Sequence, residues 1–476
     1  MSSSLSSSSS SSSEDANGNS GRRGVGDFGA PSLTRRRANN EIWPGPFVED
    51  LVVQVAIDAS RSFGRLAVAA ALANVFQRVN PDIYCQILDA VVASKGETAF
   101  DKGTDFGWVC STWQAVSRSD PLWHRLTTVI WGRTHRVHAS WREEYIYRHQ
   151  TAQNFGAGRS FYHTLHFDPA SVDNPDGLTC RCLTLSDTHL ACGFADGTVR
   201  LFDLSTRQLV GTFHPHHRDR FGRFSRAVSG IVITDPRIIF ATLDGDIHVA
   251  IIDGEPLART AHLGNVVNDG ALVDFTGCGR WWVGLYAGVP GRALHVWDGN
   301  TEELAFVNTN LTDPEAVMGW HTLTELTETI GRVRVTGQES AVACTSLRYM
   351  VVDLRNPEFP LHDREWRRRL TVTSLDTNGE AFIMVDNRGL AIVRRVDTLE
   401  EVCRFNTRNV NVMGCMNLGY ALMCAGGVVR VWEIEHGQHL YSLNQNVEEV
   451  NAMVADDRHV AAAGSDTRIH LWDFGA

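Results

Sequence analysis

The chain contains 476 residues, of which 43% are hydrophobic, and it carries a formal net charge of −11. This size and composition allow a substantial core spread over two or three domains. The acidic balance argues against a general nucleic-acid binder, because such proteins present basic surfaces. No apolar run approaches the roughly 18 residues of a membrane span, and the serine-rich start lacks the apolar stretch of a secretion signal. We therefore expect a soluble intracellular protein.

Residues 1–41 are rich in serine, glycine, asparagine and arginine and contain few apolar side chains. Such a segment buries too little apolar surface to offset the entropy cost of ordering, so it is predicted to be a disordered tail. Arg35, Arg36 and Arg37 form a basic cluster in this tail. The cluster suits nuclear import and equally suits a solvated tail, and the sequence leaves both readings open.

Residues 42–130 show helical periodicity and are predicted to form a small helical domain. Phe47, Leu51 and Val55 recur at a spacing that places them on one face of a helix. A further helical stretch, 131–155, is expected to couple this domain rigidly to the rest of the chain. Asp120 before Pro121 indicates a helix N-cap followed by proline in the first turn.

Two short motifs within the helical domain resemble the second half of an F-box. They are Val109-Cys-x-x-Trp113 and Ser119-Asp-Pro-x-Trp123. An F-box is a three-helix module that docks on the Skp adaptor of cullin-based ubiquitin ligases, and its first half usually opens with a proline and an apolar helix. The resemblance implies an adaptor-binding surface that comprises Pro46, Phe47, Leu51, Val55, Val109, Cys110, Trp113, Pro121, Leu122 and Trp123.

The segment 79–108 departs from this pattern, in which Arg78 would run directly into Val109. The segment reads as a loop between F-box helices or as translated intron, since valine codons begin with the GT of a donor splice site. In a third reading, Pro81–Leu88 supplies an alternative first helix. Sequencing the transcript across Arg78 would decide whether the segment is native.

From residue 156 to 476, one pattern recurs seven times: an alternating apolar strand that ends in an acidic residue, at spacings of about 36 to 55 residues. Gly- and Asp-rich hairpin turns such as Asp196-Gly197 precede these strands. The arrangement resembles the WD-repeat family, so the predicted fold is mainly β: a seven-bladed, WD-repeat-like β-propeller closed by the strand Phe161–Phe167. The acidic strand ends are Asp203, Asp253, Asp298, Asp353, Asp397, Glu433 and Asp473.

Two connections between blades are long, His214–Arg226 and Asn308–Ile330, and both join the outer strand of one blade to the inner strand of the next. In WD-repeat propellers such connections lie on one rim of the ring. Arginine and aromatic side chains are enriched in binding hot spots, although long loops also tolerate polar residues without any function. The predicted substrate-binding set, suited to an acidic or phosphorylated segment, is Arg218, Arg220, Arg223, Arg226, Trp320, His321, Trp366, Arg367 and Arg368.

The sequence contains no arrangement that predicts catalysis, a cofactor or a metal. Gly288–Arg292 lacks the Gly-Lys-Ser/Thr of a phosphate loop, and the histidines of His214–His217 lack a fourth ligand nearby. Cys180 and Cys182 are too close for a zinc or redox pair, and the cysteines are predicted to be buried thiols. A propeller without an assembled acid, base and nucleophile is better interpreted as a binding surface. We therefore predict that the chain is not an enzyme.

Four segments extend the resemblance to most of the chain: Val109–Trp123, Arg218–Gly230, Asn268–Trp282 and Leu311–His321. They are similar to the Sterile Apetala family of plant F-box/WD-repeat proteins. The resemblance implies a nuclear regulator of flower and organ development that binds a Skp-type adaptor, and through it cullin. It also implies that the protein recruits PEAPOD-type repressors and their associated proteins for ubiquitination, without membrane or direct nucleic-acid partners. A nuclear scaffold or transcriptional co-regulator without ligase activity is the alternative.

Overall fold

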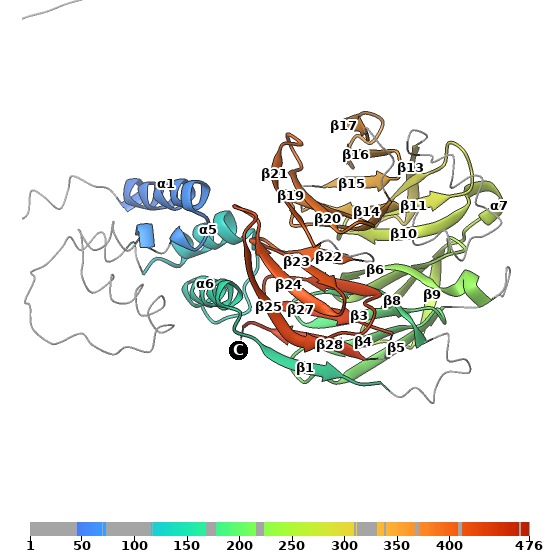
Figure 1. The fold of residues 1–476 in the computed structure, drawn as a ribbon, viewed down its shortest axis with the longest axis horizontal. Coiled ribbons are helices and arrows are strands. Elements are labelled where there is room, and N and C mark those ends of the chain that lie inside the picture. The colour runs from blue at the N-terminus through green and yellow to red at the C-terminus, as the bar shows by residue number, and fades with distance from the viewer. Residues whose placement is uncertain are drawn as a thin grey trace, which may run out of the picture.

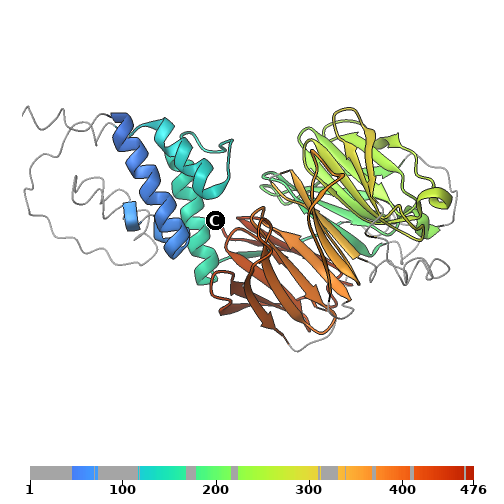
Figure 2. The same ribbon diagram turned by 90° about the horizontal axis from the view of Figure 1, so that it is seen from above.

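The computed structural model contains a group of helices beside a ring of β-sheets (Figure 1, Figure 2). None of the described helices is both long and apolar enough to cross a membrane. The predicted tail, 1–41, lies outside the described residues, as does 79–108. The structure describes residues 45–68, 70–72, 116, 118–167, 178–215, 223–308, 311, 331–337, 339–366, 371–407, 412–465 and 468–475.

The helical unit comprises α1 (Gly45–Phe63), α5 (Asp120–Trp131) and α6 (Trp141–Ala157). α5 packs between α1 and α6. It begins at Asp120 with Ser119 as its N-cap, so the predicted cap was one residue too late. α6 begins with a capping box, in which Ser140 and Glu143 each accept a hydrogen bond from the other's backbone N–H.

The described strands form seven four-stranded antiparallel blades, in which β1 (Phe161–Leu165) is the fourth strand of the last blade. A two-residue parallel pairing of β5 with β9 also joins the outer strands of blades 1 and 2. The strands of each blade follow in chain order. Blade 1 contains β2 (Cys180–Leu185), β3 (His189–Phe194), β4 (Val199–Asp203) and β5 (Leu209–Pro215). Blade 2 contains β6 (Val228–Thr234), β7 (Arg237–Thr242), β8 (Ile247–Ile251) and β9 (Leu257–His262). Blade 3 contains β10 (Ala271–Gly277), β11 (Trp281–Ala287), β12 (Leu294–Asp298) and β13 (Glu303–Asn308). Blade 4 contains β14 (Gly331–Val335), β15 (Ser340–Thr345), β16 (Arg348–Asp353) and β17 (Pro360–Glu365). Blade 5 contains β18 (Val372–Thr377), β19 (Ala381–Asp386), β20 (Leu390–Arg395) and β21 (Glu401–Asn406). Blade 6 contains β22 (Met413–Met416), β23 (Tyr420–Ala425), β24 (Val428–Glu433) and β25 (His439–Asn446). Blade 7 contains β26 (Ala452–Ala455), β27 (His459–Ala463) and β28 (Ile469–Asp473), together with β1.

The ring is closed by β1, which pairs antiparallel with β28 from Phe161 opposite Asp473 to Leu165 opposite Ile469. The first strand of each blade contacts the first strand of the next, and β26 contacts β2 to complete the circle. The predicted seven-bladed propeller and its closing strand are therefore confirmed.

The recurring acidic residue caps a turn in four of the seven repeats. There its carboxylate accepts a hydrogen bond from a backbone N–H in the turn that follows the third strand, as it does at Asp203, Asp298, Asp353 and Asp473. Asp203 accepts from Thr206 at 2.6 Å and Asp298 from Asn300 at 2.8 Å. Hydrogen bonds from Ser205 and Thr206 lower the pKa of Asp203 to about 2, which keeps this acceptor ionised. Turn capping therefore explains the acid at Asp203 and Asp353, where the preceding tryptophan of the family pattern is missing.

Neighbouring blades are held together by apolar packing and by polar bridges between their first strands. A Cβ on Gly230 would lie 1.9 Å from the carbonyl oxygen of Phe275, so only glycine permits this close approach of blades 2 and 3. First strands of adjacent blades do not form backbone ladders, and side chains satisfy part of their exposed edges. These bridges are Thr184 Oγ1 to Ile231 O (3.0 Å), Ser229 Oγ to Leu272 O (2.6 Å), Val333 N to Asp274 Oδ2 (2.8 Å), Thr373 Oγ1 to Val412 O (2.8 Å) and Met416 N to Asp376 Oδ2 (2.9 Å).

Candidate functional site

The propeller has two faces, because successive strands of a blade run in opposite directions. We call the face that carries the turns between first and second strands the docking face. The opposite face, where fourth strands connect to the first strands of the next blade, is the rim. The helical unit contacts the docking face through turns of blades 1, 5, 6 and 7. The residues contacted in these turns are Asp187, Glu380, Leu418 and Asp457.

Arg65, which follows α1, connects the helical unit to two of these turns. Its Nε donates to the carbonyl oxygen of Ile130 at the end of α5 at 2.9 Å. The same guanidinium donates to the carbonyl of Leu418 and lies 3.3 Å from Glu380 Oε1. One side chain therefore ties α5 to blades 5 and 6.

An ion network between the helices and the propeller joins blades 1 and 7. Arg133 Nη1 lies 2.8 Å from Asp187 Oδ1, and its Nη2 lies 3.5 Å from Asp457 Oδ2. Arg148 of α6 approaches the same Asp457 oxygen at 3.7 Å. Burial opposes the charge of Arg133, but Asp457 and Asp187 outweigh this effect and raise its pKa. Arg133 therefore stays charged at neutral pH, while burial raises the pKa of its partner Asp457.

Glu144 of α6 anchors this network from within the helical unit, and its side chain is 0% exposed. It accepts hydrogen bonds from Arg148 Nε at 2.8 Å, from the backbone N–H of Val137 at 3.0 Å, and from His138 at its backbone and ring nitrogens. Burial would raise the pKa of this carboxyl, but the hydrogen bonds outweigh burial and lower it to about 2. Glu144 thereby fixes both Arg148 and the α5–α6 connection.

The end of α6 packs into the junction of blades 6 and 7. The Phe155 ring stacks on Phe474 with centroids 3.7 Å apart and on Tyr420 at 5.5 Å. Asn154 Nδ2 donates to the carbonyl of Phe474 at 2.8 Å, and the Tyr420 hydroxyl donates to the carbonyl of Ala152 at 3.1 Å. Aromatic packing and hydrogen bonds thus fix α6 to the docking face.

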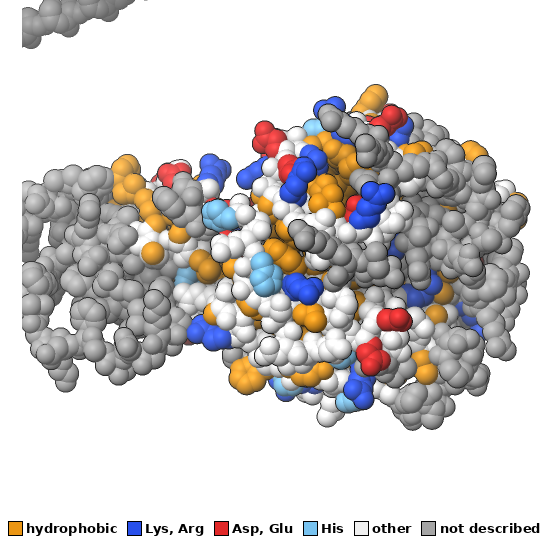
Figure 3. Space-filling model, viewed as in Figure 1, with side chains coloured by type: hydrophobic (Ala, Val, Ile, Leu, Met, Phe, Trp, Pro, Cys, Tyr) orange, Lys and Arg blue, Asp and Glu red, His pale blue; other side chains and the backbone are white. Residues whose placement is uncertain are grey.

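The first helix carries two apolar stripes, which differ in exposure. Val48 and Val52 belong to the buried stripe that packs inside the helical unit. The stripe predicted from sequence lies one residue out of phase with it: Phe47 is 48% exposed, and Leu51 and Val55 are only partly buried. Figure 3 shows apolar side chains gathered along α1. The unit's own core covers this second stripe only in part, since Leu51 and Val55 pack against that core while Phe47 is half exposed.

The other predicted adaptor-binding residues divide into three groups. Pro46 and Pro121 are exposed at the starts of α1 and α5. Leu122 and Trp123 are 1% and 3% exposed and lie in the helical core, where Trp123 packs 5.2 Å from the Tyr145 ring. They therefore hold the helices together and form no outer surface, which corrects the sequence-based interpretation. Val109, Cys110 and Trp113 lie outside the described residues.

Val129 of α5 is a surface apolar residue that the sequence analysis missed. It is 46% exposed. Leu126 and Ile130 mark the buried face of this helix, and Val129 does not share that face. This offset from the buried residues identifies Val129 as a surface residue.

On the rim, only some of the predicted substrate-binding residues are described. Arg223 begins a short 3-10 helix that ends at the half-buried Arg226. Trp366 packs against Tyr349 with ring centroids 4.4 Å apart and the rings tilted by 33°, and its Nε1 donates to the carbonyl of Thr345 at 3.1 Å. Trp366 is thus already held against blade 4. The remaining members, Arg218, Arg220, Trp320, His321, Arg367 and Arg368, lie outside the described residues.

A cavity of about 980 Å³ runs along the first strands and contains charged side chains that the sequence analysis did not identify. Arg334 Nη1 donates to Asp274 Oδ2 at 2.8 Å. Burial raises the pKa of Asp376 to about 6, against the opposing effect of Arg334 and two backbone N–H groups. Arg181 and Arg332 occupy the rim end of the same cavity wall. These residues could have been found from the sequence, because charged residues interrupt first strands that are otherwise apolar on both faces. A charge in such a strand indicates a polar cavity beside it.

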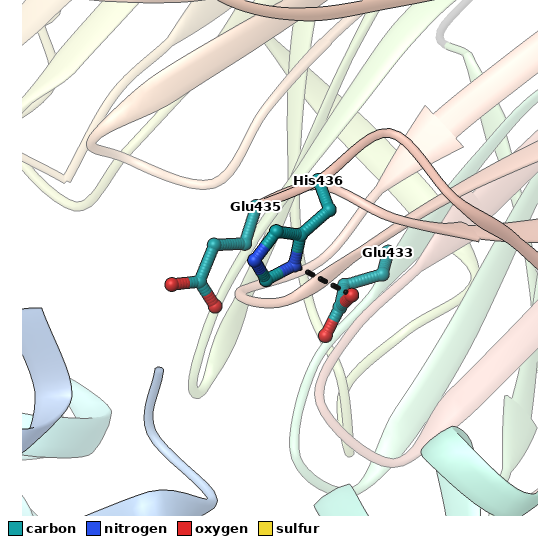
Figure 4. Close-up of side chains that lie close together, drawn as sticks. All are labelled: Glu433, Glu435 and His436. Atoms are coloured by element: carbon teal, nitrogen blue, oxygen red, sulfur yellow. Dashed lines mark hydrogen bonds and ion pairs between the residues drawn. The ribbon is translucent and has the colours of Figure 1, made fainter. Parts of the chain in front are cut away.

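Glu433, Glu435 and His436 lie in and after β24 of blade 6, and their possible ligand atoms fall within 4.8 Å of one another (Figure 4). His436 Nδ1 lies 3.0 Å from Glu433 Oε2, and this contact raises the pKa of His436. Glu435 and His436 are exposed. A surface ion pair accounts for the arrangement, and we assign no metal to it.

Comparison with known proteins places the chain in a family. No protein-family profile matches it. A protein of Arabidopsis thaliana named "Transcriptional regulator STERILE APETALA" is 57% identical over 469 residues, which cover 97% of this chain and 98% of that protein. The chain belongs to the STERILE APETALA family. The resemblance inferred from the sequence motifs is thereby confirmed.

Solved structures with a similar arrangement share little sequence with this member of the STERILE APETALA family. The propeller domain of Myceliophteria thermophila Cps50 (Swd1) has a TM-score of 0.46 and 14% identity, over 66% of this chain and 99% of that one. BamB from Moraxella catarrhalis has a TM-score of 0.44 and 14% identity, over 62% of this chain and 85% of that one. The propeller assignment rests on the strand pairing of the chain itself.

Proposed function

We propose that the chain is the substrate-recognition subunit of a Skp–cullin–F-box ubiquitin ligase. In this proposal it acts in the nucleus, recruits PEAPOD-type transcriptional repressors for degradation, and thereby regulates flower and organ development. The relative's name, a transcriptional regulator, is consistent with nuclear action. The observation that carries the proposal is the placement of the helical unit on the face of the propeller opposite the rim.

The two faces allow simultaneous binding of two partners. β18 runs from Val372 at the rim to Thr377 near the docking face, and a six-residue strand spans about 20 Å. On the docking face, Glu380 already contacts Arg65. A protein bound at the rim therefore does not compete with one bound to the outer side of the helices.

The adaptor would bind the second apolar stripe of α1, formed by Phe47, Leu51 and Val55. Exposed apolar patches on soluble proteins commonly mark protein contacts. The core of the helical unit leaves this stripe partly uncovered, which a purely structural helix does not require. Substrate acidic groups would bind at the rim, where Arg181 and Arg332 add to the predicted arginines.

In this mechanism the chain forms no bonds itself and is not the catalyst. Its contribution is proximity, because holding two reactants at a fixed separation replaces a bimolecular encounter. The contacts of Arg65, Arg133, Glu144 and Phe155 fix the helical unit on the propeller. This stiffness would set the distance between the substrate lysine and the ubiquitin-charged enzyme.

Binding of the purified full chain to a plant Skp adaptor, measured by calorimetry, tests the proposal. Phe47→Glu should reduce affinity at least about tenfold, since it places a charge in an apolar contact. Leu257→Glu is the matched control, because Leu257 is 52% exposed on the outer strand of blade 2. Trp113→Ala, and a chain without 79–108, test the predicted second half of the F-box. Equal binding by the Phe47 and Leu257 variants would refute the adaptor surface.

The second candidate is a nuclear scaffold or transcriptional co-regulator without ligase activity. The name of the relative fits this function as well as it fits a ligase receptor. If no form of the chain binds the adaptor while the propeller still binds PEAPOD-type repressors, the scaffold function is favoured.

A further inference from the structure

The basic residues of this chain are almost all arginine. It contains 44 lysines and arginines, and the only lysines are Lys95 and Lys102. Lysine is among the commonest residues of soluble proteins. Both lysines fall within 79–108, so the entire described part of the helical unit and propeller is lysine-free.

Arginine's geometry explains part of this preference. Arg458 donates from Nε and Nη2 to the two carboxylate oxygens of Asp473, each at 2.8 Å. Arg348 spans Asp363 and Glu365 with its two terminal nitrogens at 3.1 and 2.7 Å. A planar fork is needed for such contacts, and an ammonium group cannot replace it.

Other arginines make contacts that lysine would make equally well. Arg125 Nη1 lies 2.5 Å from Asp50 Oδ1, and both side chains are more than half exposed. Arg136 Nη1 lies 3.5 Å from Asp120 Oδ2. Single-point surface ion pairs contribute about 0–1 kcal/mol whichever cation supplies them. Fold stability therefore does not explain why lysine is missing from these positions.

The difference between the two cations is chemical. In ubiquitin transfer, a neutral lysine ε-amine attacks the thioester carbonyl that joins ubiquitin to the cysteine of a conjugating enzyme. An amide N–C bond forms, the thioester C–S bond breaks, and the cysteine leaves as a thiol with the proton that the amine gives up. Arginine remains protonated and delocalised, so it offers no such amine.

Cysteine thiols, the other strong nucleophiles, are poorly available on the described surface. Five described cysteines are buried and three are half-buried. Burial raises the pKa of the Cys424 thiol to about 11 and also raises that of Cys415. These two thiols stay protonated and buried in the folded chain.

We propose that lysine is excluded from the described helical unit and propeller so that these surfaces cannot accept the ubiquitin that the chain directs to its substrate. This inference rests on the proposed ligase function and deepens it. The receptor holds a charged conjugating enzyme close to its own surface for as long as it holds a substrate. Without acceptor amines on that surface, transfer is restricted to lysines of the bound protein, and the receptor survives repeated cycles.

The test compares three forms of the full chain in a reconstituted reaction with a Skp adaptor, a cullin–RING module and a ubiquitin-charged conjugating enzyme. One form is unaltered, and one is made lysine-free by K95R and K102R. The third adds R280K, R355K and R395K to the lysine-free form. Arg280 and Arg355 are 51% and 67% exposed and each meets one oxygen of Glu339, while Arg395 is an exposed residue at the end of β20.

Two readouts separate the possible outcomes. Mass spectrometry counts ubiquitin per chain, and discharge of the thioester onto free lysine reports whether the assembly is active. We expect about tenfold more ubiquitin on the three-lysine form than on the lysine-free form, because tethering gives effective concentrations in the millimolar range. Accelerated discharge with equally unmodified chains would overturn this inference alone. Absence of adaptor binding and of accelerated discharge in all three forms would overturn the ligase function itself, and the inference with it.

Discussion

Replacing Glu144 by glutamine should detach α6 from its ion network while keeping the shape of the side chain. The carboxylate is 0% exposed and accepts bonds from Arg148 and His138. Glutamine keeps one oxygen acceptor but turns an amide N–H₂ toward these donors. Arg148 is then left buried with an incomplete partner.

The expected loss can be worked out from the pKa of Glu144. A fall from 4.5 to about 2 corresponds to about 3 kcal/mol of stabilisation at neutral pH, because each tenfold change is about 1.4 kcal/mol. Removing one partner of a buried pair costs about 3–5 kcal/mol, which agrees. Since the folded-state pKa is lowered, this stabilisation is fully present above pH 4.5 and is lost as pH falls through about 2.

Native-state hydrogen exchange followed by mass spectrometry is a suitable measurement, because it reports local opening in a chain of two bodies. A loss of about 3 kcal/mol should speed exchange of the α6 amides by about a hundredfold. Glu143→Gln is the control, because Glu143 is exposed and glutamine can still accept from the Ser140 N–H. If α6 exchanges at the same rate in both variants, Glu144 does not anchor this helix and the reasoning is wrong.

Three further predictions concern the propeller and its junction with α6. Burial raises the pKa of Asp376 to about 6 from 3.8, so the free energy of unfolding should fall by up to about 3 kcal/mol as pH rises from about 4 to 7. Asp376→Asn should abolish this loss when urea unfolding is compared at about pH 4 and pH 7, and an unchanged pH dependence would contradict the prediction. Gly230→Ala should lower the thermal unfolding midpoint by several degrees, because the added Cβ would overlap a backbone carbonyl of blade 3. Gly337→Ala is the control and should leave the midpoint unchanged, because a Cβ added there has no atom within 4 Å. Phe155→Ala should cost about 3–5 kcal/mol and speed proteolysis after α6, while Phe359→Ala, at a site 70% exposed, should do neither.

Repetition made the propeller predictable from the sequence. In four repeats the acid after the third strand serves one local purpose, as Asp203 and Asp298 show by accepting from the turn that follows. A local requirement that recurs along the chain is visible without knowledge of tertiary contacts. The closing strand was identifiable for the same reason, since Phe161–Leu165 is an alternating strand that precedes the first complete blade.

The helical unit was less predictable, because its apolar residues fall on more than one face. Phe47, Leu51 and Val55 have helical spacing, yet Val48 and Val52 form the buried side. Sequence periodicity identifies each stripe but does not say which one meets a core. The structure leaves the predicted stripe partly exposed, which is the property an adaptor surface needs.

The contacts that position the site could not be predicted, because they join residues remote in sequence. Arg65 and Leu418 are 353 positions apart, and Asp187 and Asp457 are turn acids whose partners come from the helical unit. In the sequence these acids look like ordinary solvated turn residues. The charges of the central cavity, such as Arg334 with Asp274, likewise pair only once neighbouring blades are placed side by side.

The closing strand gives the chain a dependence on the order of its synthesis. β1 follows directly after α6, but its partner β28 and the seat of Phe155 on Phe474 come about 300 residues later. A growing chain that has completed its helices still exposes an unpaired strand and an unseated α6. The contacts of the helical unit with the last blade, Phe155 on Phe474 and Arg133 with Asp457, therefore form only when the end of the chain has been made. A product interrupted before β28 would keep α1 and its apolar stripe but lack both the partner of β1 and the seat of Phe155.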